Sequence, residues 1–288
     1  MSRFGLAMHL LMALDQGFES LAAVALTSFL LHQRFESLVL VSPAEETFPQ
    51  LDALAAAFAV PLRHQAIGDA AALHQLPASV RPYFFCIEAL QQSDPGRYLY
   101  VDADTLCVSN LEALTDLPLS EERPMAAASH GRPMPDRALL LGLETQYHYF
   151  NAGVLLFDSS CLAALLTPPD VVQYFLQNRA LCRFREQCAL NALLRGRLQY
   201  LPGQFNLLSW MRPRQQDNPW HELACNPMAY CLPDVRDNAA IVHLSAGALP
   251  NRLPAERLER FDLYWLMLQQ GLQQPQVAPQ LPRYAERW

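Results

Sequence analysis

Buried-looking apolar runs alternate with segments of helical periodicity along the 288-residue chain, and this alternation predicts an α/β fold. Strands are expected at residues 4–14, 38–41, 62–67, 97–101, 124–129, 149–158 and 239–245. Helices are expected at residues 20–33, 51–59, 82–92, 185–196 and 254–270. Pro61 ends the second helix, Pro82 suits the first turn of the third, and Gly196 ends the fourth. Prolines gather in 118–135, 202–233 and 273–282, which predicts loops there.

The chain is long enough to bury the core of one large domain or of two small ones. The alternation continues through residues 1–270 without an internal repeat. Residues 271–288 are rich in glutamine and proline and are expected to form a C-terminal tail.

Composition narrows the function classes. A net charge of −7 argues against a general nucleic-acid binder. No apolar run reaches the roughly 18–20 residues that span a bilayer. The apolar run at 4–14 follows Arg3 and superficially resembles a signal peptide, but no small-residue cleavage motif follows it. Seven scattered cysteines without a Cys-x-x-Cys pair favour reduced thiols and a cytoplasmic location.

The chain contains no lysine, because all 21 of its basic residues are arginine. Codon drift in a GC-rich genome is favoured over selection against lysine modification as the explanation. In either case, lysine Schiff-base chemistry and a P-loop lysine are excluded.

Asp102 and Asp104 directly follow the apolar strand predicted at 97–101. Residues i and i+2 of an extended chain point the same way, so both carboxylates can face one point, and the small Ala103 lets a ligand approach. Two adjacent carboxylates repel each other unless a cation joins them, and a hard divalent ion is the natural partner. The alternative is a pair of solvated carboxylates in a turn, or a cap for a helix that begins near Asn110.

Two enzyme chemistries use such a pair. In a haloacid dehalogenase-like phosphatase, the string "DADTL" would make Asp102 the nucleophile and Asp104 the acid/base. In a nucleotide-sugar glycosyltransferase, the pair would hold a metal ion on the diphosphate. The phosphatase needs a downstream lysine and a late acidic cluster, and neither is found, so the glycosyltransferase is favoured.

Four blocks resemble the retaining family-8 glycosyltransferases: "RYLYVDADTLCVSNLEAL", "YFNAGVLLFD", "EQCALNALLRGRLQYLPGQFN" and "AAIVHLSAGALPN". The resemblance implies a GT-A fold, that is, one Rossmann-like nucleotide-sugar-binding domain with a mixed central sheet. It also implies a UDP-hexose donor and a divalent cofactor, Mn²⁺ or alternatively Mg²⁺. The expected reaction moves the hexose to a hydroxyl of a glycan or glycolipid acceptor, with lipopolysaccharide as one candidate.

The resemblance also assigns residues of the metal and the nucleotide. Asp102, Asp104 and His243 match the metal ligands, and a histidine among oxygen donors suits manganese. Ala13 and Asp15 match residues that contact the uracil base, and Phe18 lies near the nucleoside.

The sugar end is assigned in the same way. Asn151, Ala152 and Gly153 match the segment that lines the donor sugar, although a core strand with a bulge at Gly153 explains the same letters. Glu186 and Gln187 match the acidic-Gln pair under the anomeric carbon and are the expected catalytic residues, with Gln187 in a supporting, orienting role.

The chain differs from the family at two positions that usually carry a basic residue. Phe85 occupies the position of an arginine, with Arg81 one turn earlier, and Leu249 occupies that of a lysine, with Arg252 nearby. Glu186 and Cys188 also depart from the usual Asp-Gln-Asp. A second hypothesis is therefore a degenerate, non-catalytic member that binds a nucleotide sugar or a partner.

The C-terminus allows at most peripheral membrane contact. Arg283, Tyr284, Arg287 and Trp288 provide basic and aromatic side chains, but the stretch is short and a solvated tail is favoured. The expected location is cytoplasmic, at most peripheral to the inner face of the membrane.

Overall fold

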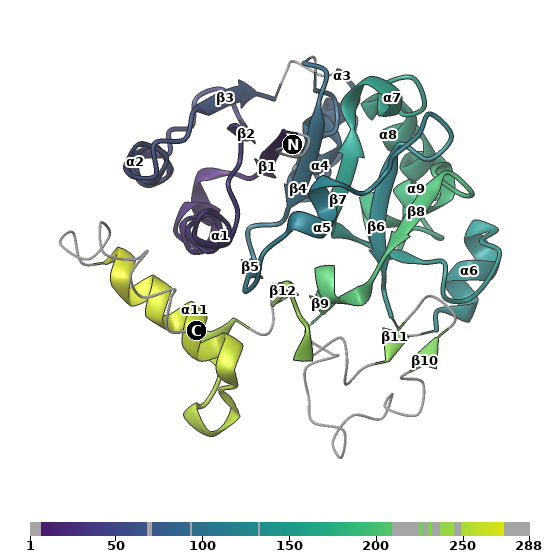
Figure 1. Ribbon diagram of the computed structural model, residues 1–288. Coiled ribbons are helices and arrows are strands. Elements are labelled where there is room, and N and C mark those ends of the chain that lie inside the picture. Colours follow the sequence, from purple (N-terminus) through teal and green to yellow (C-terminus); the bar gives the residue numbers. More distant parts are fainter. Residues whose placement is uncertain are drawn as a thin grey trace, which may run out of the picture.

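The structure, a computed structural model, describes residues 7–67, 71–92, 94–131, 133–208, 225–226, 230–231, 237–244 and 249–273. Within these ranges one mixed sheet of seven strands forms the centre of the molecule (Figure 1). In spatial order its strands are β3 (Leu62–Ala66), β2 (Leu38–Ser42), β1 (Met8–Ala13), β4 (Arg97–Val101), β7 (Phe150–Asp158), β6 (Met125–Ser129) and β8 (Leu198–Leu201). Strand β7 runs antiparallel to both neighbours, and the other pairs are parallel.

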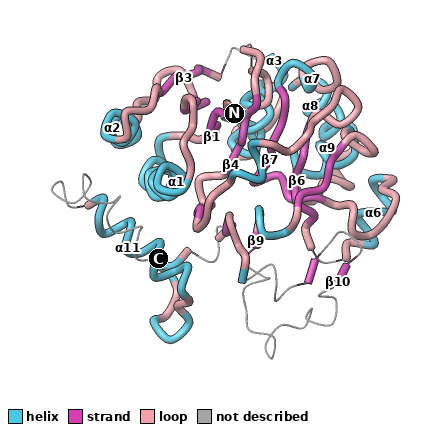
Figure 2. The backbone as a smooth tube through the Cα atoms, in the orientation of Figure 1, coloured by secondary structure: helices cyan, strands magenta, loops and turns pink. Residues whose placement is uncertain are grey.

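Helices cover both faces of this sheet, as the traced backbone in Figure 2 shows. The helices among the described residues are α1 (Glu19–His32), α2 (Pro49–Ala57), α3 (Ala71–His74), α4 (Phe85–Ala89), α5 (Glu112–Thr115), α6 (Pro135–Leu141), α7 (Ser159–Leu162), α8 (Pro168–Gln177), α9 (Arg185–Leu193) and α11 (Arg260–Leu272). One core cluster joins α4, α8 and α9 to the sheet, and another joins α1 and α2 to it. Because both faces are covered, the central strands β2 and β4 are buried throughout.

A second, smaller sheet lies at the end of β4. It consists of β5 (Thr105–Cys107), β12 (Ile241–His243) and β9 (Leu207–Leu208), with β12 in the middle. A third core cluster packs α11 over this sheet and against α1, and a short ladder joins β10 (Cys225–Asn226) to β11 (Tyr230–Cys231). Ser28 of α1 accepts a hydrogen bond from the backbone N–H of Cys107, which fixes β5 to the helix.

The expected strands and helices are present, with different ends. The first strand begins at Met8, since Ala7 is not part of it, and residues 4–6 of the expected range lie outside the described residues. The helix expected at 82–92 is a 3₁₀ turn (Arg81–Phe84) followed by the short α4. The helix expected from 254 begins only at Arg260, because Leu258 is extended and Glu259 forms a capping box with Asp262.

The loop prediction for 118–135 is wrong in part, because β6 lies inside it and α6 begins at Pro135. Most of the predicted proline-rich loop at 202–233 and of the tail at 271–288 lies outside the described residues, so the domain boundary at 270 stays a prediction. No described helix combines the length and apolarity that crossing a bilayer requires.

Candidate active site

The end of β4 places the two aspartates. Asp102 follows the last residue of the strand, and its N–H donates to the carbonyl of Gly153 on β7. The chain then turns sharply, because the N–H and hydroxyl of Thr105 both donate to the carbonyl of Asp102. This turn leads into β5, so the short loop between two buried strands carries both carboxylates.

The pairing of β5 with β12 brings in His243 from the far end of the sequence. His243 lies opposite Thr105 in the ladder, and the next residue, Leu244, donates its N–H to the carbonyl of Asp104. His243 Nε2 is 3.1 Å from Asp104 Oδ1 and 3.8 Å from Asp102 Oδ2. The structure therefore brings together the three residues that the sequence resemblance assigns to the metal.

The donor set fits a divalent cation. One ligand atom from each of Asp102, Asp104 and His243 lies within 4.8 Å of the other two. His243 Nδ1 faces the side-chain oxygens of Asn151 and Asn206 at 3.1 and 3.2 Å, which leaves Nε2 directed at the carboxylates. Two carboxylates and one imidazole are ligands that manganese accepts.

A neighbouring glycine makes room for this cluster. A Cβ at Gly153 would lie 2.2 Å from His243 Cε1 and 2.6 Å from Asp102 Oδ2, so only glycine fits between them. The pairing of β6 with β7 is also irregular here. Ala127 pairs with Leu155, but Ser129, two positions further along β6, pairs with Phe150, five positions away on β7. The irregularity expected from the sequence falls within this stretch of β7.

In the cluster, the two carboxylates and the imidazole shift each other's pKa values in opposition to burial. Burial and the neighbouring Asp104 raise the pKa of Asp102 to about 6, although His243 acts in the opposite direction. Burial opposes the imidazolium of His243, but the two aspartates raise its pKa above the ordinary value. The pKa of Asp104 is lowered despite burial because His243 stabilises the carboxylate. The imidazole and the two carboxylates therefore stabilise each other's charged forms.

A second network fixes Gln187 on α9. Its amide oxygen accepts hydrogen bonds from the Asn151 side chain and the Ala152 backbone, both at 3.0 Å. Its amide nitrogen donates to the hydroxyl of Tyr149 at 3.0 Å. Gln187 is 8% exposed and has one orientation that satisfies all these partners.

Glu186, the preceding residue, is the least satisfied group of the site. Its Oε2 is buried and has no hydrogen-bond partner among the described residues. Burial, with a smaller contribution from Asp102, raises the pKa of Glu186 to about 8. The carboxyl is therefore mostly protonated at neutral pH and is available as a hydrogen-bond donor.

A cavity of about 430 Å³ connects these groups. Its lining contains Asp102, Ala103, Asp104, Ala152, Gly153, Glu186 and Gln187, and also Ala13 at the end of β1 and Asp15 and Phe18 beyond it. Asp15 uses one oxygen to cap the 3₁₀ turn Gln16–Phe18, and the ring of Phe18 is 49% exposed. Asn151 does not line the cavity directly and lies behind it, between Gln187 and His243.

The cationic positions proposed from the sequence do not reach this cavity. Arg81 donates to the carbonyls of Leu76 and His74 instead. Phe85 lines the cavity, and Leu249 is buried in the cluster under α11. Of the described residues, no lysine, arginine or histidine is part of the cavity lining.

Several supporting residues of the site are not predictable from the motifs in the sequence. Tyr100 donates to Asp102 Oδ1 at 2.7 Å, Tyr149 holds Gln187, and Asn206 bonds Asn151 and faces His243. Tyr100 could have been found from its i, i+2 relation to Asp102 on one strand. Tyr149 and Asn206 act across long sequence separations that a single sequence does not reveal.

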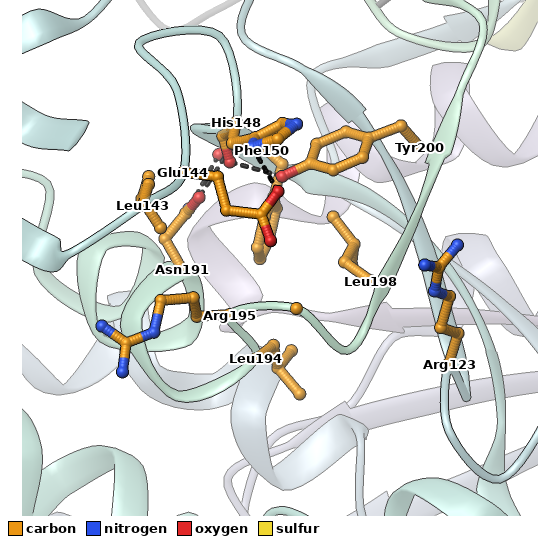
Figure 3. A pocket seen from close by; sticks show the side chains of 11 residues that line it. Arg123, Leu143, Glu144, His148, Phe150, Asn191, Leu194, Arg195, Leu198 and Tyr200 are labelled. Atoms are coloured by element: carbon orange, nitrogen blue, oxygen red, sulfur yellow. Dashed lines mark hydrogen bonds and ion pairs between the residues drawn. The ribbon is translucent and has the colours of Figure 1, made fainter.

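A smaller cavity of about 220 Å³ lies elsewhere, beside β8 and the C-terminal end of α9 (Figure 3). Arg123 and Arg195 flank it from different sides in Figure 3, and Tyr200 donates to the carbonyl of His148 across it. None of the residues assigned from the sequence lines this cavity.

Comparisons with known proteins give matches in sequence and in fold. Residues 9–249 match the sequence model of "Glycosyl transferase family 8". A lipopolysaccharide 1,2-glucosyltransferase of Escherichia coli (strain K12) is 26% identical over 123 residues, which is 42% of this chain and 36% of that protein. The chain therefore matches about a third of the length of this relative.

Solved structures share the fold. The galactosyltransferase LgtC, in complex with donor and acceptor sugar analogs, superposes with a TM-score of 0.73 at 18% identity, covering 93% of this chain and 97% of that one. The apo-form glycosyltransferase GlyE of Streptococcus pneumoniae TIGR4 gives 0.67 at 16% identity, covering 98% of this chain and 64% of that one. At these identities the likeness shows the fold, which is GT-A with a mixed central sheet as expected.

Proposed function

This chain belongs to glycosyl transferase family 8, and we propose that it transfers a hexose from a UDP-sugar to a hydroxyl of a glycan with retention of configuration. The observation that carries the proposal is that Asp102 and Asp104, which form one cluster with His243, line a single cavity together with Glu186 and Gln187. The phosphatase alternative is set aside because the family is a glycosyltransferase family.

The residues in and beside the cavity can be divided among the nucleoside, the diphosphate and the hexose of the donor. Ala13, Asp15 and Phe18 would hold the nucleoside, since Asp15 keeps one carboxylate oxygen for the base and Phe18 offers an exposed ring. Asp102, Asp104 and His243 would hold Mn²⁺, or alternatively Mg²⁺, at the diphosphate. Ala152, Gly153, Glu186 and Gln187 would surround the hexose.

The bound ion would act as a Lewis acid that neutralises charge on the departing diphosphate. The amide oxygen of Gln187 already accepts hydrogen bonds from Asn151 and Ala152, so it is not available as a nucleophile. Gln187 therefore has a positioning role beside the sugar. Glu186, protonated at neutral pH, donates a hydrogen bond to a sugar hydroxyl and places no full negative charge there. The acceptor hydroxyl enters on the face that the diphosphate leaves, and its proton passes to the leaving oxygen.

The acceptor class is proposed by similarity. The E. coli relative is named for a lipopolysaccharide substrate, which supports a glycan or glycolipid acceptor here. A cytoplasmic location with at most peripheral membrane contact through the tail is part of the proposal, and the tail lies outside the described residues.

The decisive experiment measures binding and turnover separately. Calorimetry is expected to show UDP binding that requires Mn²⁺. UDP release is then measured with UDP-glucose, UDP-galactose and UDP-N-acetylglucosamine. Asp104→Asn removes one metal ligand, so it should lose Mn²⁺-dependent binding and transfer while keeping the wild-type thermal midpoint. Asp136→Asn, an exposed aspartate in the first turn of α6, is the matched control and should behave as wild type.

A second candidate is a non-catalytic binding module, and the absence of a cation from the described cavity lining favours it. Manganese-dependent UDP binding without UDP release from any of the three donors would support this candidate. Absence of UDP binding, with or without Mn²⁺, would refute both the transferase and a module that binds nucleotide sugars.

A further inference from the structure

Arg185, the first residue of α9, has a backbone conformation that residues with side chains rarely adopt. Its φ is +45°, and only Ala59 shares a positive φ among the described non-glycine residues. A left-handed conformation costs an L-residue about 1–2 kcal/mol, so glycine would be the easier choice at this position. The strain occurs directly before Glu186 and Gln187, and local strain of this kind clusters at functional sites.

The guanidinium of Arg185 is held but not neutralised. Its central carbon lies 3.8 Å from the ring centroid of Tyr83, which is 47% exposed and lines the 430 Å³ cavity. Stacking occupies the face of the guanidinium and leaves its in-plane N–H donors available. No described residue accepts a hydrogen bond from them or forms an ion pair with them.

The cation lies on the sugar side of the cavity. Arg185 directly precedes Glu186 and Gln187 on α9, the two residues assigned to the hexose. Its partner Tyr83 lines the cavity from the turn Arg81–Phe84, whereas the two aspartates lie in the loop after β4. A guanidinium in this place is therefore positioned for a group beyond the hexose and not for the diphosphate at the metal.

We propose that Arg185, stacked on Tyr83, binds an anionic substituent of the acceptor glycan close to the hydroxyl that reacts. The substituent is a phosphate or a carboxylate, because the fork of N–H donors matches both in a bidentate arrangement. This inference rests on the proposed function and adds the chemical class of the acceptor to it.

The test uses the full chain saturated with Mn²⁺ and UDP, so that the donor side is filled. Glucose 6-phosphate, glucuronate and the neutral methyl glucoside are titrated by calorimetry. At least one charged probe is expected to bind about tenfold more tightly than methyl glucoside, and the two charged probes distinguish phosphate from carboxylate. Arg185→Gln should abolish this preference and leave the affinity for UDP unchanged.

Two further variants separate recognition from folding. Arg185→Gly removes the guanidinium and relieves the strained φ, so its thermal midpoint should not fall although the preference for charged probes is lost. Arg195→Gln, at the other end of α9, is the control and should keep the preference, because Arg195 is exposed and bonds the carbonyl of Gly142.

Three outcomes would overturn the inference. These are equal binding of charged and neutral probes by the wild type, a preference that survives in both Arg185 variants, and a loss of UDP affinity in Arg185→Gln. The last would assign the cation to the donor diphosphate. Failure of the wild type to bind UDP would refute the proposed function itself, so the two failures are distinguishable.

Discussion

Single residues decide whether the metal cluster can form at all. Gly153 is needed for space, because the positions that its Cβ would occupy are taken by His243 and Asp102. Tyr100 and Asn151 determine how Asp102 and His243 are oriented. Metal affinity therefore depends on the residues that orient the ligands as well as on the space at Gly153.

Gly153→Ala is therefore expected to weaken Mn²⁺ binding by about 10- to 100-fold, because His243 or Asp102 must move to accommodate the methyl group. Isothermal titration of Mn²⁺ measures the loss. Gly196→Ala is the control: its φ of +73° makes alanine cost about 1 kcal/mol in stability, but nothing lies within 4 Å of the added Cβ. Unchanged Mn²⁺ affinity in Gly153→Ala would contradict the placement of the cluster.

Glu186 gives stability a pH dependence of known sign. The folded chain keeps a proton on Glu186 up to a pKa of about 8, whereas the unfolded chain releases it near pH 4.5. The folded state thus binds more protons between these values, and its free energy of unfolding falls as pH rises through that window.

Glu186→Gln cannot ionise and should escape this loss. Relative to wild type, the variant should gain about 3–4 kcal/mol in free energy of unfolding between pH 5 and pH 8. Urea denaturation of the metal-free proteins at both pH values measures the difference. Glu144→Gln, on an exposed glutamate, should show no such gain. Parallel pH profiles for wild type and Glu186→Gln would show that the buried carboxyl is already ionised at pH 5.

At the scale of elements, the site depends on three connections: β4 to β7, β5 to β12, and β7 to α9. The first carries Asp102 beside Gly153, the second brings His243 to Asp104, and the third locks Gln187 to Asn151 and Ala152. Each connection joins segments far apart in sequence, so the geometry of the site is a property of the sheet and not of any one motif.

Tyr149→Phe tests the third connection. It removes the hydroxyl that accepts from Gln187 Nε2 and lies 3.1 Å from Cys188 Sγ, leaving a buried amide donor without a partner. We expect a loss of about 1–3 kcal/mol in stability and a fall in kcat larger than any change in KM for the UDP-sugar. Steady-state kinetics with thermal melts measures both. Tyr200→Phe, which removes a hydroxyl bonded to His148 outside the site, should lower stability without the selective fall in kcat.

Burial, strand length and long-range contacts decide which parts of the fold and the site the sequence predicts. Strands and helices with strong apolar patterns were found, because burial on both faces of the sheet leaves continuous apolar runs. The three-residue strand Thr105–Cys107 was missed, because it is too short to show a period. The partners Tyr149 and Asn206 were missed because only the folded topology brings them to Gln187 and His243.

For the whole molecule, the question is how β12 is held at the end of the large sheet. Strand β12 has only three residues, and of its neighbours β5 has three and β9 has two. Its support is the cluster in which Val24 of α1 and Trp265 of α11 pack with Leu106 and Val242. The C-terminal helix thereby helps to position His243, although it contributes no ligand.

Trp265→Ala should reveal this dependence. The indole is 2% exposed, so its truncation is expected to cost about 3–5 kcal/mol in stability and to loosen the position of His243. Mn²⁺ binds only the arranged cluster, so the metal should raise the thermal midpoint of wild type more than that of the variant at equal concentration. Leu263→Ala is the control on the same helix, because Leu263 is 47% exposed and should leave both the midpoint and the metal-induced shift unchanged. If Trp265→Ala lowers the midpoint but keeps the full shift with Mn²⁺, α11 stabilises the fold without positioning the histidine.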